Sequence, residues 1–163
     1  VVRKSLHHAI GLMDVIELEN VSDIYRLVPT EGKILKPIKI NESEKSKKLV
    51  RVVTKTSINK ETTQTGFHDG RSTLAEVKAS VGDTCVMQIP DQKILDIIKL
   101  EAGCQGLVVR GINAGQIGKV ESVEKGTFIL PKRVILILGD KKIEIPADII
   151  MPIGKEEPVI QLK

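Results

Sequence analysis

The chain has 163 residues, 41% of them hydrophobic and 28% charged, which is typical of a soluble globular protein with one domain or two small ones. No apolar run approaches the roughly 18 residues of a membrane span and no signal-peptide pattern opens the sequence, so we expect a cytoplasmic protein without a membrane partner. The net charge of +4 and the pI of about 9.0 are compatible with a polyanionic partner.

Aromatic residues make up only 2% of the chain, namely Tyr25, Phe67 and Phe128. These are too few to build a platform on which splayed bases stack. A bound nucleic acid would therefore be held by its backbone and shape, through cations and loop amides. Cys85 and Cys104 form no C-x-x-C pair, which favours buried structural roles over a zinc site.

The first half of the chain is predicted to form strands separated by turns. The charged segment 41–48 predicts an exposed turn or a short helix. Residues 49–59 alternate in character and predict a half-buried strand, with Arg51 and Lys55 on one face about 13 Å apart at ~3.3 Å per residue. "GFHDGRSTL" predicts a tight hairpin with Asp69 and Gly70 as its structural turn. "TCVMQI", residues 84–89, predicts another strand.

Residues 90–100, "PDQKILDIIKL", predict the one helix, with Asp91 as N-cap and an apolar side of Ile94, Leu95, Ile97 and Ile98. The loop that follows places a domain boundary near residue 100, between a β-rich central domain (11–100) and a second unit (101–163). Short strands are predicted in that unit near 107–110, 117–124, 127–130, 133–138 and 142–146. Five short strands in so few residues are typical of a small barrel with a C-terminal tail.

The glycine-rich stretch "VVRGINAGQIGKV" does not fit a nucleotide-phosphate loop. A P-loop ending at Gly118-Lys119 needs glycine where Asn113 stands and Ser or Thr where Val120 stands. A dinucleotide fingerprint must open a helix, whereas this loop leads into a β-branched run. The pattern instead predicts a turn between two strands, with Gly111, Gly115 and Gly118 as structural turn residues.

No catalytic constellation appears in the sequence. The doublet His68-Asp69 is compatible with a metal-dependent phosphohydrolase, but such a site needs further ligands, and the only other histidines are His7 and His8. No nucleophile, base and orienting group recur at a sensible spacing. We therefore expect no enzyme activity, no cofactor and no metal.

The residues around Gly118 resemble a known family. A hydrophobic pair, a glycine, a short loop and "GQIGKV" are similar to the KOW motif, and Gly118 occupies its fixed glycine. "GLMDVIEL" at 11–18, "HDGR" at 68–71 and "PDQKILDIIKLEAG" at 90–103 stand in the same order as in one KOW family. That family is small-subunit ribosomal protein four of the archaeal and eukaryotic type, and the resemblance runs from about residue 9 to Leu162.

The resemblance implies a mainly β protein with a β-rich central domain and a KOW barrel of the Src-homology-three type. It implies a structural constituent of the small ribosomal subunit that binds ribosomal RNA and neighbouring ribosomal proteins and serves translation. Such a protein has no small-molecule substrate and is a monomer outside the ribosome. Residues 1–10 would be a remnant of an upstream RNA-binding domain or a linker. The end soon after the barrel favours an archaeal member. The alternative is a KOW transcription-elongation module that binds RNA polymerase.

Candidate RNA contacts are side chains that place donors on exposed faces or loops, where they reach phosphate and 2′-OH groups. They lie on the predicted strand 49–59, after the Asp69-Gly70 turn, in the glycine loop and after Pro131: Arg51, Lys55, Arg71, Arg110, Asn113, Gln116, Lys119, Lys132 and Arg133. Glu121, Glu124 and Glu144 share the second unit, so its positive surface is predicted to be one-sided.

Overall fold

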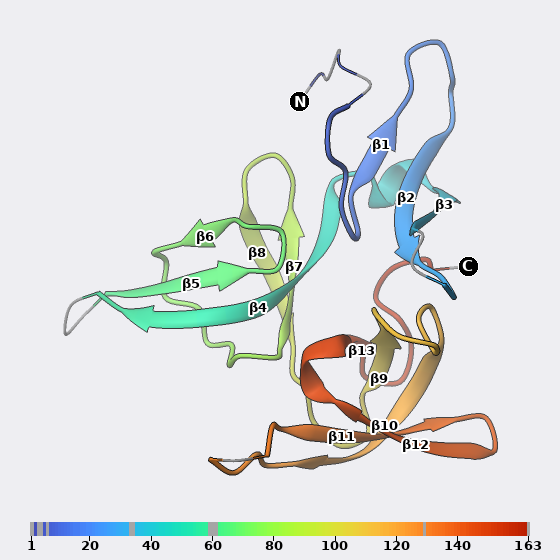
Figure 1. Cartoon of the computed structure of the whole chain (residues 1–163). Helices are drawn as coiled ribbons and strands as arrows, with labels where there is room; N and C mark the ends of the chain where they lie inside the picture. The colour runs from blue at the N-terminus through green and yellow to red at the C-terminus, as the bar shows by residue number, and fades with distance from the viewer. Residues whose placement is uncertain are drawn as a thin grey trace.

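The computed structural model describes residues 2, 5, 7–32, 35–58, 62–128 and 130–162, which form three antiparallel sheets (Figure 1). The mainly β fold is therefore confirmed. The first sheet has the order β1-β2-β3 and contains β1 (Val15–Glu17), β2 (Ile24–Pro29) and β3 (Leu35–Ile40). A short 3-10 helix, η1 (Glu42–Glu44), follows, in the segment predicted as a turn or short helix.

The second sheet is built around one long strand, β4 (Lys47–Ser57), in the order β6-β5-β4-β7-β8. β4 pairs with β5 (Thr63–Phe67) on one side and β7 (Thr84–Gln88) on the other, and β6 (Ser72–Thr73) pairs with β5. A register shift against β5 between Val52 and Thr54 interrupts the alternation that the sequence predicts. Both faces of β4 are buried near its start, because Leu49 packs into one core while Val50 packs into another.

The predicted helix at 90–100 is wrong, because residues 93–98 form strand β8 (Lys93–Ile98), paired antiparallel with β7. Gln92 adopts a positive φ of 58° and its N–H donates to the carbonyl of Gln88 at 2.8 Å, which turns the chain into a hairpin. Ile94 and Ile97 pack against the second sheet's core, whereas Leu95 is half exposed. The spacing of these apolar residues therefore fits a strand with a bulge as well as it fits one side of a helix.

The third sheet wraps around its own core in the order β12-β11-β10-β9-β13. Its strands are β9 (Gln105–Val108), β10 (Ile117–Glu124), β11 (Arg133–Leu138), β12 (Lys141–Pro146) and β13 (Ile150–Gly154). A 3-10 turn, η2 (Ala147–Ile149), leads into β13, a strand that the sequence did not predict. The strand predicted near 127–130 is wrong for Thr127, Phe128 and Leu130, which connect β10 to β11 outside any strand; residue 129 lies outside the described residues.

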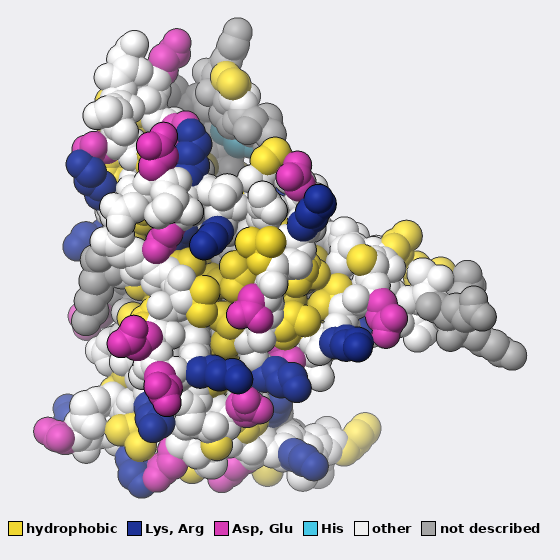
Figure 2. All heavy atoms as spheres, turned by 180° about the vertical axis from the view of Figure 1, so that it is seen from behind, with side chains coloured by type: hydrophobic (Ala, Val, Ile, Leu, Met, Phe, Trp, Pro, Cys, Tyr) yellow, Lys and Arg dark blue, Asp and Glu magenta, His cyan; other side chains and the backbone are white. Residues whose placement is uncertain are grey.

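One hydrophobic core joins the segment before β1 to the second and third sheets. It contains Met13 before β1, Leu49 of β4, Val86 of β7, Leu107 of β9 and Met151 of β13, each fully or almost fully buried. From behind, a hydrophobic area ringed by charged side chains lies in the middle of the molecule (Figure 2). The division near residue 100 stays a prediction. In the described part of the chain, no helix is long and apolar enough to cross a membrane.

Both cysteines are free and buried, as the sequence predicts: Cys85 lies in β7, and Cys104, just before β9, packs into the core of the third sheet. Burial raises the pKa of the Cys85 thiol to about 11, and burial likewise raises the pKa of Cys104. Both thiols are therefore protonated and inert at neutral pH, which fits a packing role.

Candidate nucleic-acid interface

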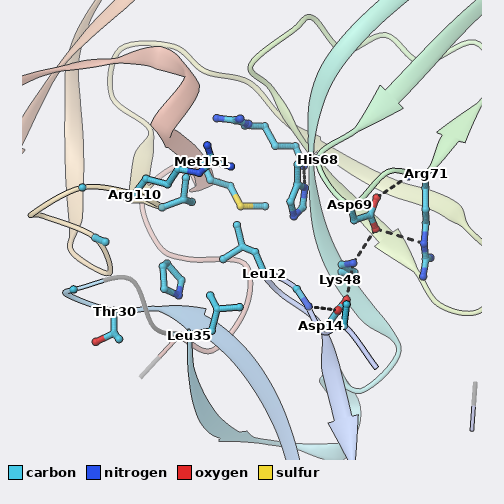
Figure 3. Close-up of a pocket in the computed structure, with 18 residues that line it drawn as sticks. Leu12, Asp14, Thr30, Leu35, Lys48, His68, Asp69, Arg71, Arg110 and Met151 are labelled. Carbon is cyan, nitrogen blue, oxygen red and sulfur yellow. Dashed lines mark hydrogen bonds and ion pairs between the residues drawn. The ribbon is translucent and has the colours of Figure 1, made fainter. Parts of the chain in front are cut away.

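A cleft of about 820 Å³ lies where the three sheets meet (Figure 3). Its walls come from the segment before β1, the end of β2, β4, the turn after β5, the loop after β9, and β13. Residues from these elements that line it include Leu12, Asp14, Pro29, Lys48, Arg51, His68, Asp69, Arg71, Arg110 and Met151. The topology thus brings together three of the predicted RNA-contacting arginines, from two different sheets.

Lys48 is the centre of a buried ion network on one side of this cleft. Its ammonium donates to Oδ1 of Asp14 and to Oδ2 of Asp69, each at 2.8 Å, and its side chain is 3% exposed. The guanidinium of Arg71 lies 3.4 Å from Oδ2 of Asp69. Burial raises the pKa of Asp69, but the hydrogen bond and charge of Lys48 outweigh it, so the net shift is downward. Asp69 is therefore a carboxylate that already has two cationic partners.

Arg51 joins β4 to the third sheet. Its Nη1 donates to the backbone carbonyl oxygens of Asp148 and of Ile150, the latter at 3.2 Å. Its backbone N–H donates to Nδ1 of His68 at 3.0 Å. Burial lowers the pKa of Arg51, the charge of Arg110 lowers it further, and Asp148 opposes both. Arg51 is thus a fixed, partly desolvated cation rather than a solvated surface side chain.

His68 lies between this cation and the ion network. Burial lowers the pKa of its imidazole, and the charges of Lys48 and Arg51 act in the same direction, against Asp69 and the backbone of Leu12. The imidazole is therefore neutral at pH 7. Because its Nδ1 accepts a hydrogen bond from the backbone N–H of Arg51, it fastens the turn after β5 to β4.

The glycine loop, residues 110–116, forms one rim of the cleft. Gly111 and Gly115 have φ values of 90° and 86°, which favour glycine. The backbone N–H groups of Ala114, Gly115 and Gln116 all donate to carbonyls within the loop or β9. These amides are occupied, so the loop presents side chains such as those of Arg110 and Gln116, which are exposed.

Gly118 lies inside β10, and its φ is not in the left-handed region. A Cβ atom there would collide with the carbonyl oxygen of Ile137 and would lie 2.6 Å from a methyl group of Leu138. Close approach of β11, not backbone strain, therefore requires glycine at the fixed position of the motif. Its neighbour Lys119 is exposed and does not line the cleft.

The remaining predicted contacts lie away from the cleft. The ammonium of Lys55 donates to the carbonyls of Val77 and Ala79 at 2.9 and 3.1 Å, and Arg133 pairs with Glu144 at 2.7 Å. Lys132 lines a smaller cavity of about 230 Å³ beside Asp148. Asn113 is half-buried and also does not line the larger cleft. Lys48 and His68 were missed as site residues because their burial is a tertiary property.

The chain is mainly β, and cationic side chains line the cleft where its sheets meet. Residues 21–94 match the Ribosomal family S4e. The small ribosomal subunit protein eS4 of Staphylothermus marinus is 38% identical, over 99% of this chain and 68% of that protein. The eS4 protein of Methanothermobacter thermautotrophicus is 35% identical, over 98% of this chain and 66% of that protein. The chain therefore belongs to the S4e family of ribosomal proteins.

A solved structure agrees with this assignment. The 30S ribosomal protein S4e of Thermoplasma acidophilum matches with a TM-score of 0.75 at 28% identity, over 90% of this chain and 73% of that one. These relatives carry small-subunit or 30S ribosomal names. The alternative of a transcription-elongation module has no support from them.

Proposed function

We propose that this chain is a structural constituent of the small ribosomal subunit, which binds ribosomal RNA through backbone and shape contacts and serves translation. Family membership, with 38% identity over 99% of the chain, is the observation that carries this conclusion. Its location is the ribosome in the cytoplasm, with neighbouring ribosomal proteins as further partners. It is a monomer outside the ribosome, performs no catalysis and takes no small-molecule substrate.

The cleft supports this role because its charge is unbalanced. Four cationic side chains line it, Lys48, Arg51, Arg71 and Arg110, against the two carboxylates of Asp14 and Asp69. Lys48 and Arg71 pair with these carboxylates. The excess positive charge therefore comes from Arg51 and Arg110. A concave surface with surplus guanidinium groups attracts a polyanion and matches the geometry of phosphate oxygens.

Reconstitution tests the ribosomal role. Tagged chain is added to archaeal small subunits salt-stripped of their own S4e protein, and the mixture is separated on a sucrose gradient. Co-migration with small subunits supports the proposal, and an Arg110→Ala variant should be released at lower salt than the parent. An Arg133→Ala variant is the matched control, because Arg133 lies outside the cleft. Absence of the parent chain from the small-subunit fraction contradicts the proposal.

A further inference from the structure

The geometry points to a seat for one phosphodiester group of RNA between the guanidinium groups of Arg51 and Arg110. This inference rests on the proposed function and names the part of the RNA that the cleft takes. Arg51 comes from β4 and Arg110 from the loop after β9, so the seat is formed by two sheets. A phosphate held there would connect those sheets as well as bind the RNA.

The hydrogen bonds of Arg51 leave one specific edge available. A guanidinium has five N–H donors, and the two on Nη1 are taken by the carbonyls of Asp148 and Ile150. Among the described residues, neither Nε nor Nη2 of Arg51 donates to a protein group. The Nε–Nη2 edge is the side that pairs with two oxygens of a phosphate in the bidentate manner. The carbonyls thus fix the group in place and leave that edge for a ligand.

Arg110 supplies the second cation. Its side chain is exposed on the rim, and no carboxylate of the described residues forms an ion pair with it. Its backbone is held from both sides, because the Val109 N–H donates to the carbonyl of Ile149 at 2.8 Å and the loop closes through Gly115 N–H to Val108. Arg110 is therefore a positioned cation on a braced loop.

The two arginines repel each other in the free protein. Burial is the largest cause that lowers the pKa of Arg51. The charge of Asp148 opposes it, and the charge of Arg110 lowers the pKa further. The single exposed carboxylate of Asp148 does not fully neutralise the two guanidinium groups. A phosphate between them replaces this repulsion with two charge-assisted contacts.

The carboxylates that line the cleft do not compete for this position. Asp14 and Asp69 are bound by Lys48, and Figure 3 shows that network on the opposite side of the cleft from Arg110. The apolar side chains of Leu12 and Met151 lie between the two sides. The cleft volume of about 820 Å³ admits a phosphate together with its adjoining riboses.

A double-mutant cycle tests the seat, with affinity for archaeal small-subunit ribosomal RNA transcript measured by filter binding. Arg110→Ala should weaken binding about tenfold, and Arg51→Lys about fivefold, because lysine keeps the charge but lacks the fork. If both arginines hold one phosphate, the fold-loss of RNA affinity in the double variant should be clearly smaller than the product of the two single fold-losses. In the control pair, Arg110→Ala with Lys119→Ala, the two fold-losses of affinity should multiply, because Lys119 does not line the cleft.

Thermal melting of each variant separates folding from binding, since Arg51 also holds two carbonyls and Arg110 is exposed. If the parent binds the RNA and the Arg110→Ala variant binds it as tightly, the phosphate seat is overturned while the proposed function stands. Losses that multiply in the Arg51 and Arg110 cycle also overturn the seat. A parent chain that binds no ribosomal RNA overturns the proposed function and this inference together.

Discussion

Lys48 and Asp69 form a 2.8 Å ion pair across 21 residues of sequence, with side chains that are 3% and 10% exposed. The pair joins β4 to the turn after β5. Asp14 binds the same ammonium at 2.8 Å and brings in the segment before β1. One lysine therefore ties together three segments that form the wall of the cleft.

Lys48→Met should destabilise the chain strongly. Removing the ammonium leaves the Asp69 carboxylate buried with only Arg71 beside it, and breaking a buried pair from one side costs about 3–5 kcal/mol. Urea denaturation measures the loss. Lys45→Met is the matched control, because Lys45 pairs with Glu17 on the surface, where both side chains are largely exposed. Equal stability of the two variants would show that the network contributes nothing.

The neutral His68 predicts a pH dependence of stability. Its folded-state pKa lies below the ordinary value of about 6.5, mainly through burial. The unfolded chain therefore binds a proton more readily, and stability should fall as the pH drops below about 6.5 and through the folded-state pKa. In His68→Asn, the asparagine Oδ1 can accept the hydrogen bond from the Arg51 backbone N–H. This variant should show a flatter dependence of stability on pH in this range. A profile identical in parent and variant would contradict the assignment.

Asp69 predicts a second loss of stability at lower pH. Its folded-state pKa is depressed, since the hydrogen bond and charge of Lys48 outweigh burial. The stability that this pair contributes is present above the unfolded value of about 3.9 and is lost as the pH falls through the folded value. Acid unfolding of Asp69→Asn should show a shallower decline below pH 4 than the parent. An unchanged acid limb would contradict the pairing.

Gly118→Ala should cost more than about 1 kcal/mol of unfolding free energy, because the new methyl group collides with the backbone of β11. Gly11→Ala is the control, since a Cβ there meets only Oδ2 of Asp14 at 3.5 Å, an ordinary contact. Chemical denaturation compares the two. A Gly118→Ala protein as stable as the control would mean that β10 and β11 separate readily.

Lys119→Ala should leave folding intact and weaken RNA binding about equally across sequences, as the loss of one phosphate contact does. The lysine is exposed beside Gly118 on β10. Lys142→Ala is the control, because the ammonium of Lys142 is already paired with Glu121. Filter binding that shows no difference between the two variants would make Lys119 ordinary surface.

Local pattern predicted most of the fold. The strands at 49–59, 84–89, 117–124, 133–138 and 142–146 follow from alternation and turn residues, and the structure places a strand in each. The segment 90–100 misled, because isoleucines that fit a helical side also fit a bulged strand, and the positive φ of Gln92 has no sequence signature. Strand β13 was missed because Pro152 is unfavourable in a central strand, and β13 lies at a sheet edge.

The candidate site was less predictable than the fold. Arg51, Arg71 and Arg110 were selected one by one as exposed donors, and their meeting in one cleft depends on how the sheets pack. Lys48 lies in a polar, charged segment predicted to be exposed, yet it is almost completely buried between two carboxylates. Burial of a charge is decided by partners distant in sequence, which local pattern does not contain.

The salt dependence of RNA binding tests the central claim most directly. Affinity of the chain for archaeal small-subunit ribosomal RNA is measured from low to high salt, and each neutralised phosphate contributes about −0.7 to −0.9 to the slope of log affinity against log salt. The unpaired cations of the cleft and of the β10 surface, Arg51, Arg110 and Lys119, predict a slope of roughly −2 to −3. Binding that is unchanged by salt, or no binding at the lowest salt, would contradict recognition of the RNA backbone.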